Sequence, residues 1–96
     1  MSLETQRRIR EIGENTIEML IEKNQSYGDS ALNPLGIFGN KDAVTSLGAR
    51  IDDKLARIST LGLDLYHAED NVKDLIGYLI LLQVELDNRK ASEISG

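Results

Sequence analysis

Cysteine is absent from this sequence of 96 residues, and histidine occurs once, at His67. Without cysteine the chain has no disulfide framework, no zinc site built on thiolates and no cysteine nucleophile. Aromatic residues make up only 4% of the chain, so a hydrophobic core must come from Leu, Ile and Val. The single proline leaves little to interrupt a helix. These shortages favour a small helical domain with an aliphatic core.

Long hydrophobic runs are also missing. The longest, Leu79–Leu82, is far shorter than the about 20 residues of a transmembrane helix, and the polar N-terminal residues do not resemble a signal peptide. A net charge of −5 disfavours general binding to duplex nucleic acid. We therefore expect a cytoplasmic protein with no membrane or duplex partner, whereas a small anionic ligand needs only a few cations.

Three segments with helical periodicity predict an all-α fold, a small bundle of three long helices in one domain over residues 1–96. The predicted helices cover residues 4–24, 42–59 and 69–90, and residues 91–96 are expected to fray. Asn40 and Asp42 are alternative candidates for the N-cap of the second helix, and Gly62 is a candidate left-handed residue after it.

The third predicted helix is apolar on nearly all sides between residues 75 and 86. Its apolar residues are Leu75, Ile76, Leu79, Ile80, Leu81, Leu82, Val84 and Leu86. A helix of this kind is normally buried all round, and two companion helices do not suffice to cover it. We expect a second copy of the chain to do so, which makes the protein a homodimer or a higher homo-oligomer.

A long loop is predicted between the first two helices, over residues 25–39. It carries one charge, three glycines and the only proline. Loops of this length are uncommon in compact domains and are often functional, so the segment is a candidate ligand-binding loop. The alternative is a packed connector whose apolar residues cover the bundle.

Cationic residues form a stripe on the second predicted helix. Arg50, Lys54 and Arg57 follow one another at i, i+4 and i+7 and so share a helix face. Two guanidinium groups and an ammonium group in line are suited to phosphate oxygens. The alternative is a solvated face on which Asp53 pairs with the two arginines.

Acidic residues share a face of the third predicted helix, where Asp70, Asp74 and Tyr78 are spaced by four residues. Asp74 borders the apolar stretch and therefore needs a partner or a metal. One interpretation is an ion pair with Arg50 or Lys54 across antiparallel helices, and the other is a pocket lined by acids and bases. Gly77 within the helix costs about 1 kcal/mol relative to Ala, which close approach of a helix or a ligand would explain.

The first predicted helix contains Glu11 and Glu14, whose ExxE spacing can direct two carboxylates at one divalent cation. No Walker-type glycine loop, GxSxG or HExxH motif occurs. If the chain is an enzyme, metal-assisted hydrolysis on carboxylates is therefore the remaining chemistry.

Three stretches in order, over residues 23–38, 50–58 and 69–82, resemble the phage-associated family called nucleotide modification associated domain 1. The most specific is YGDSALNPL. The resemblance implies a role in nucleotide metabolism in a host bacterial cytoplasm. By matching position it implies that the ligand-binding residues are Lys23, Tyr27, Gly28, Asn33, Arg50, Asp53, Lys54, Arg57, Asp70 and Asp74, and the polar faces suggest Tyr78 beside them.

The helix layout is also similar to the all-α nucleotide pyrophosphatases of the MazG and dimeric dUTPase type. That likeness implies a magnesium site on Glu11, Glu14, Asp70 and Asp74. The position three residues before Asp74 is Asn71, however, and a neutral amide is a poor magnesium ligand.

We therefore expect a protein that binds a nucleotide or nucleotide-derived signal without turnover, with no cofactor required, and sequesters it. The alternatives are a Mg²⁺-dependent nucleoside triphosphate pyrophosphatase and a structural or adaptor oligomer.

Overall fold

The protein is built of three α-helices. The computed structural model describes residues 2–27 and 42–95, and of residues 27, 65–67, 94 and 95 it describes only the backbone. The helices are α1 (Leu3–Tyr27), α2 (Ala43–Leu61) and α3 (Leu65–Ser95), and the described ranges contain no strand. The predicted all-α fold is confirmed.

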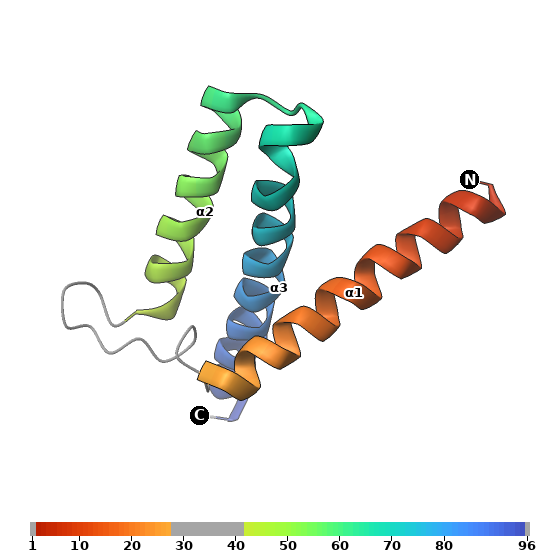
Figure 1. Cartoon of the computed structure of the whole chain (residues 1–96). Coiled ribbons are helices and arrows are strands. Elements are labelled where there is room, and N and C mark those ends of the chain that lie inside the picture. Colours follow the sequence, from red (N-terminus) through yellow and green to blue (C-terminus); the bar gives the residue numbers. More distant parts are fainter. Residues whose placement is uncertain (1, 28–41, 96) are drawn as a thin grey trace.

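Helices α2 and α3 form an antiparallel hairpin (Figure 1). Leu47 is 1% exposed and is the largest fully buried side chain of the described residues. Ala43 near the start of α2 and Ala68 near the start of α3 are also buried. The packed core is therefore small and lies between these two helices.

Both ends of α2 carry the capping residues that the sequence predicts. The Asp42 carboxylate accepts a hydrogen bond from the Thr45 N–H at 2.9 Å, which satisfies one of the unpaired donors of the first turn. At the other end Gly62 has φ 85° and ψ −175°, and its N–H donates to the Ile58 carbonyl. Only glycine readily adopts this backbone conformation, so Gly62 ends the helix where it does.

Helix α3 is longer than predicted at both ends. It begins at Leu65, because Asp64 occupies the N-cap position and its carbonyl accepts a hydrogen bond from the Ala68 N–H. It continues to Ser95, whereas the sequence predicts helix only to residue 90. Arg89 links this end of α3 to the start of α2, because its guanidinium donates a hydrogen bond to the Asp42 carboxylate.

The pair of Arg89 and Asp42 predicts a specific acid sensitivity. The Arg89 guanidinium, followed by the Thr45 hydroxyl and N–H, lowers the pKa of Asp42 to about 2. The unfolded value is about 3.9, so the contribution to stability is complete above that pH and is lost as the pH falls towards 2. We expect Asp42→Asn, which keeps a capping side chain that does not titrate, to lose less stability between pH 5 and pH 2.5 in urea unfolding. Parallel pH profiles for the two proteins would contradict this role.

Helix α1 crosses α3 obliquely and then leaves the hairpin, so that its N-terminal half projects away from it (Figure 1). At the crossing, a Cβ atom built on Gly77 would lie 3.2 Å from Cδ2 of Leu20. The glycine in α3 is therefore explained by close approach of a helix, one of the two explanations that the sequence allows. Thr16 is buried at the same contact and donates its hydroxyl to the Ile12 carbonyl.

Apolar side chains remain exposed on all three helices. Those at least one third exposed include Ile9, Ile12, Ile17, Ile21, Leu55, Val72, Leu79, Ile80, Val84 and Leu86. The chain exposes 7396 Å² in total, whereas a compact monomer of this mass exposes about 5500 Å². In the single chain these large apolar side chains are left without cover. None of the described helices is long and apolar enough to cross a membrane.

Candidate functional site

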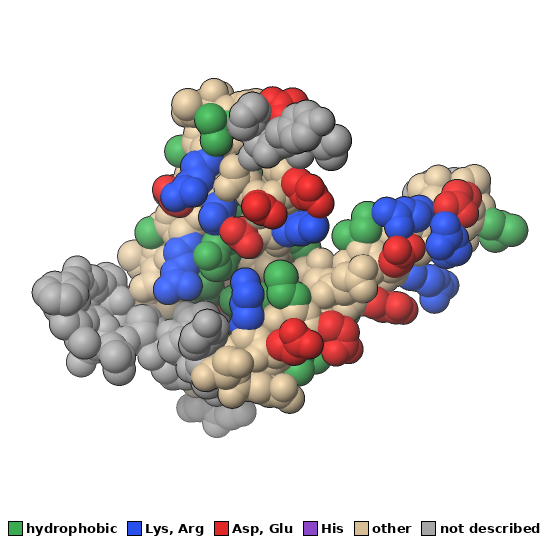
Figure 2. All heavy atoms as spheres, viewed as in Figure 1, with side chains coloured by type: hydrophobic (Ala, Val, Ile, Leu, Met, Phe, Trp, Pro, Cys, Tyr) green, Lys and Arg blue, Asp and Glu red, His purple; other side chains and the backbone are tan. Residues whose placement is uncertain are grey.

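The predicted cationic stripe lies on α2 beside the acidic residues of α3. Figure 2 shows Lys and Arg side chains over α2 next to Asp and Glu side chains over α3. The antiparallel hairpin produces this arrangement, because the middle of α2 and the N-terminal half of α3 lie at the same level. Arg50, Lys54 and Arg57 nevertheless have three different partners.

Lys54 and Asp74 form an ion pair between the two helices. The Lys54 Nζ lies 2.9 Å from Oδ2 of Asp74, and the two side chains are 15% and 34% exposed. One of the two interpretations of Asp74, an ion pair across antiparallel helices, is therefore observed. The ion pair gives the partly buried Asp74 carboxylate an opposite charge. It also means that Lys54, the central cation of the stripe, already has a partner.

Arg50 lies over the ring of Tyr78, with its Cζ atom 5.9 Å from the ring centroid. This distance is within the range of a cation–π contact, which positions the guanidinium group and leaves its N–H donors available. Among the residues that the structure describes, no carboxylate forms an ion pair with Arg50. The side chain is exposed, so Arg50 is a cation beside Tyr78 that remains open to an anion from solvent.

The remaining predicted ligand residues of the hairpin lie on its surface. Arg57 pairs with Asp53 of its own helix at 3.1 Å, and both side chains are more than half exposed. Asp70 is exposed in the second turn of α3. An exposed pair within one helix contributes little to stability, so Arg57 can exchange Asp53 for a ligand at small cost.

The predicted loop residues are described only in part. Lys23 is exposed near the end of α1. Tyr27 is the last residue of α1, but its side chain, Gly28 and Asn33 lie outside the described residues. Their predicted contact with a ligand stays a prediction.

The predicted magnesium ligands lie on two different helices. Glu11 and Glu14 belong to α1, where Glu11 pairs with Arg7 and with Arg8, while Asp70 and Asp74 belong to α3. In the parts of the chain that the structure covers, no three His, Cys, Asp or Glu side chains gather as a metal site. The four acids are therefore not brought together within one chain, and Mg²⁺ binding stays a prediction.

Asn71, which replaces the expected acid of the pyrophosphatase motif, is 7% exposed. No buried side-chain nitrogen or oxygen atom in the described residues lacks a hydrogen-bond partner. The amide thus belongs to the polar interior of the helix packing. A charged carboxylate at this buried position would need an additional cation.

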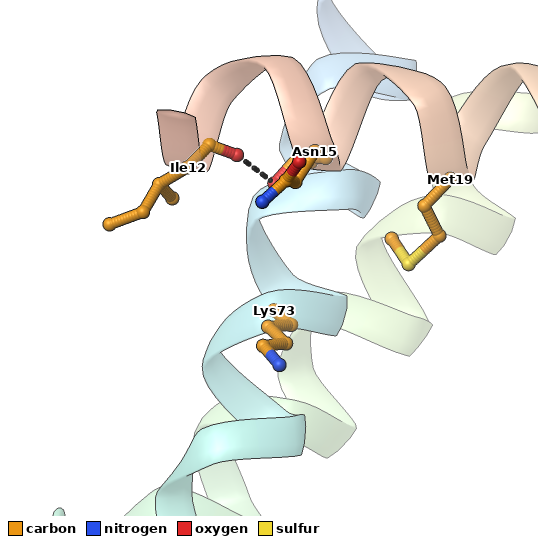
Figure 3. Close-up of a pocket in the computed structure, with 5 residues that line it drawn as sticks. Ile12, Asn15, Met19 and Lys73 are labelled. Atoms are coloured by element: carbon orange, nitrogen blue, oxygen red, sulfur yellow. Dashed lines mark hydrogen bonds between the residues drawn. The ribbon is translucent and has the colours of Figure 1, made fainter. Parts of the chain in front are cut away.

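A shallow hollow of about 220 Å³ lies between α1 and α3 and was not predicted from the sequence. Ile12, Asn15, Thr16 and Met19 of α1 and Lys73 of α3 line it, and Figure 3 shows Lys73 below the α1 side chains. The Lys73 ammonium binds Glu69 at 3.1 Å. The sequence signal for this hollow was the pair of polar residues Asn15 and Thr16 on or beside the apolar stripe of α1. An apolar stripe indicates that a helix face is buried, but it does not indicate that a hollow forms there.

No protein-family model, curated protein or solved structure significantly matches this chain. The resemblances stated above therefore stay predictions, and the geometry of the described residues is the evidence on which a function can be argued.

Proposed function

We propose that the protein binds a nucleotide or a nucleotide-derived molecule without turning it over, with the ligand phosphates held at Arg50. The observation that carries this proposal is the Arg50 guanidinium, which rests on Tyr78 and has no carboxylate partner in the described part of the chain. A guanidinium in a fixed position is a bidentate donor to phosphate oxygens.

Arg57 adds a second cation to this surface. It lies seven residues after Arg50 on α2, and its ion-pair partner among the described residues is the exposed Asp53. Lys54, between them, stays with Asp74 and sets the spacing of the two helices. The proposed site therefore uses two arginines for phosphate, while the base is assigned to Tyr78 and, on the resemblance, to Tyr27 and the loop that follows it.

The absence of turnover is part of the proposal for a chemical reason. In the all-α nucleotide pyrophosphatases that the helix layout resembles, hydrolysis of a nucleoside triphosphate requires several carboxylates around magnesium. Here one of the four candidate acids is paired with Lys54 and another with two arginines. Sequestration of a nucleotide signal in a phage-infected cell is the biological role that the resemblance suggests for such a binder.

A thermal-shift screen with mono-, di-, tri- and cyclic nucleotides, each with and without Mg²⁺, tests the proposal. At least one nucleotide should raise the melting temperature of the parent chain, and Arg50→Ala should reduce that shift by more than half. Arg10→Ala is the matched control, because it removes the same charge from the projecting part of α1. No shift with any nucleotide would contradict binding, and release of pyrophosphate would replace binding with hydrolysis.

A second candidate function is a structural or adaptor oligomer. The pairing of Lys54 with Asp74 and the exposed apolar residues of α1 and α3 favour it. In that case Arg50→Ala changes the melting temperature equally with and without nucleotides. The same screen thus separates the two functions, and self-association is compatible with both.

A further inference from the structure

We infer that the outer face of α3, defined as Val72, Ile76, Leu79, Gln83 and Leu86, binds the same face of a second copy running antiparallel to it. Val72, Leu79 and Leu86 are 38%, 48% and 45% exposed in the single chain. These three large apolar side chains are therefore available to a partner.

The spacing of this face is that of a coiled-coil seam. Its five residues follow one another at alternating steps of four and three, which keeps a face directed at a partner helix along several turns. Val72, Leu79 and Leu86 occupy one of the two seam positions, and Ile76 and Gln83 the other. A polar residue at one seam position, here Gln83, is a known means of selecting one register.

The other two sides of α3 are already occupied. Asp74 and Tyr78 face α2, as the ion pair with Lys54 and the contact with Arg50 show. Gly77 faces α1 through Leu20. Successive residues are rotated by about 100° around a helix, so the outer face occupies the third sector, which no described element covers.

The exposed area agrees with a second copy as the occupant. The chain exposes 7396 Å², about 1900 Å² more than a compact monomer of its mass. Obligate dimers bury roughly 1000–2500 Å² on each partner. The exposed apolar side chains of α3 supply part of the surface for such an interface.

Charge selects the antiparallel orientation. When Leu79 of one copy lies opposite Gln83 of the other, Ile76 lies opposite Leu86, and on the flank Lys73 faces Asp87 while Ile80 faces its own equivalent. Both flanking charges are exposed, and in the described part of the chain their contacts lie within α3, Lys73 with Glu69 and Asp87 with Gln83. A parallel pair would instead place Lys73 beside Ala68 and Asp87 beside Leu82, without an opposite charge.

Charge reversal on the full-length chain tests both the face and the orientation. Lys73→Glu places two carboxylates opposite each other, and Asp87→Lys places two ammonium groups there. Each variant alone should raise the dimer dissociation constant by roughly tenfold, the change expected when two exposed charge pairs become repulsive. An equimolar mixture of the two variants should recover the parent dissociation constant, because both flanking pairs are then of opposite charge.

Recovery in the mixture separates pairing between copies from effects within one helix. Substitutions that disturb only the contacts with Glu69 or Gln83 would weaken each variant and leave the mixture equally weak. Analytical ultracentrifugation of the single variants, the mixture and the double variant measures this directly. A mixture no tighter than the single variants would overturn the antiparallel register, and a parent chain that stays monomeric would overturn the interface.

Discussion

The Leu79→Glu variant is expected to elute and sediment as a single chain at concentrations at which the parent chain is paired. Leu79 is 48% exposed and lies at the centre of the outer face of α3, so a second copy would bury the introduced carboxylate without a cation. An unpaired buried charge costs roughly 3–5 kcal/mol. Each pair of chains contains two such positions, so the dissociation constant should rise by at least about 100-fold.

The folded single chain should tolerate this change, so a loss of association can be distinguished from unfolding. At its exposed position the glutamate remains in water, and its helix propensity is close to that of leucine. Leu63→Glu is the matched control, because Leu63 is 73% exposed in the connector between α2 and α3. The interface would be disproved if Leu79→Glu and Leu63→Glu had the same mass and the same concentration dependence of melting as the parent chain.

Asp74→Ala is expected to lower the free energy of unfolding by about 2 kcal/mol, between the values for exposed and for fully buried ion pairs. The substitution leaves the Lys54 ammonium, which is only 15% exposed, without its partner at 2.9 Å. The cost arises mainly from this unpaired charge rather than from the lost contact, so Lys54→Met in the same chain should restore part of the stability.

Asp70→Ala is the control for this prediction, since Asp70 is exposed on the same helix. Substitutions at such positions usually change stability by less than about 0.5 kcal/mol. Urea unfolding of the three variants measures the difference. Equal stability of Asp74→Ala and Asp70→Ala would show that the ion pair is not structural, and loss of nucleotide binding without loss of stability would assign Asp74 directly to a ligand.

The fold could be predicted because local signals agree with the long-range packing. The periodicity of the three segments, the capping carboxylate of Asp42 and the position of Gly62 all depend on residues within a few positions of one another. The start of α3 was missed because Tyr66 and His67 have modest helix propensity. Asp64 carried the correct signal as an N-cap residue, which starts the helix at residue 65, four positions before the predicted start at residue 69.

The position of α1 could not be predicted, because a periodic stripe shows that one face is apolar and not what covers it. Ile9 and Ile12 follow the stripe, yet both are about half exposed. The turns around Thr16 and Leu20 lie against α3, where Gly77 leaves room for Leu20. An apolar stripe has the same sequence pattern whether its own chain or a second chain covers it. The pattern therefore does not tell which of the two buries Ile9 and Ile12.

The sequence predicted which residues belong to the candidate site, but it did not predict which of them contact one another. Spacing along each helix placed Arg50, Lys54 and Asp74 on the correct faces. Spacing does not distinguish which cation reaches Asp74, because that depends on the axial offset of α2 against α3. The structure assigns Lys54 to Asp74 and Arg50 to Tyr78, and the proposed function therefore uses Arg50 rather than Lys54 for the ligand.

Sedimentation equilibrium of the unmodified chain over a dilution series most directly tests whether a second copy completes the fold. The outer face of α3 predicts a mass of at least two chains of 10.7 kDa each at micromolar concentration, with dissociation on dilution. A mass of one chain at every concentration would contradict it and would leave the exposed apolar residues of α3 without a partner.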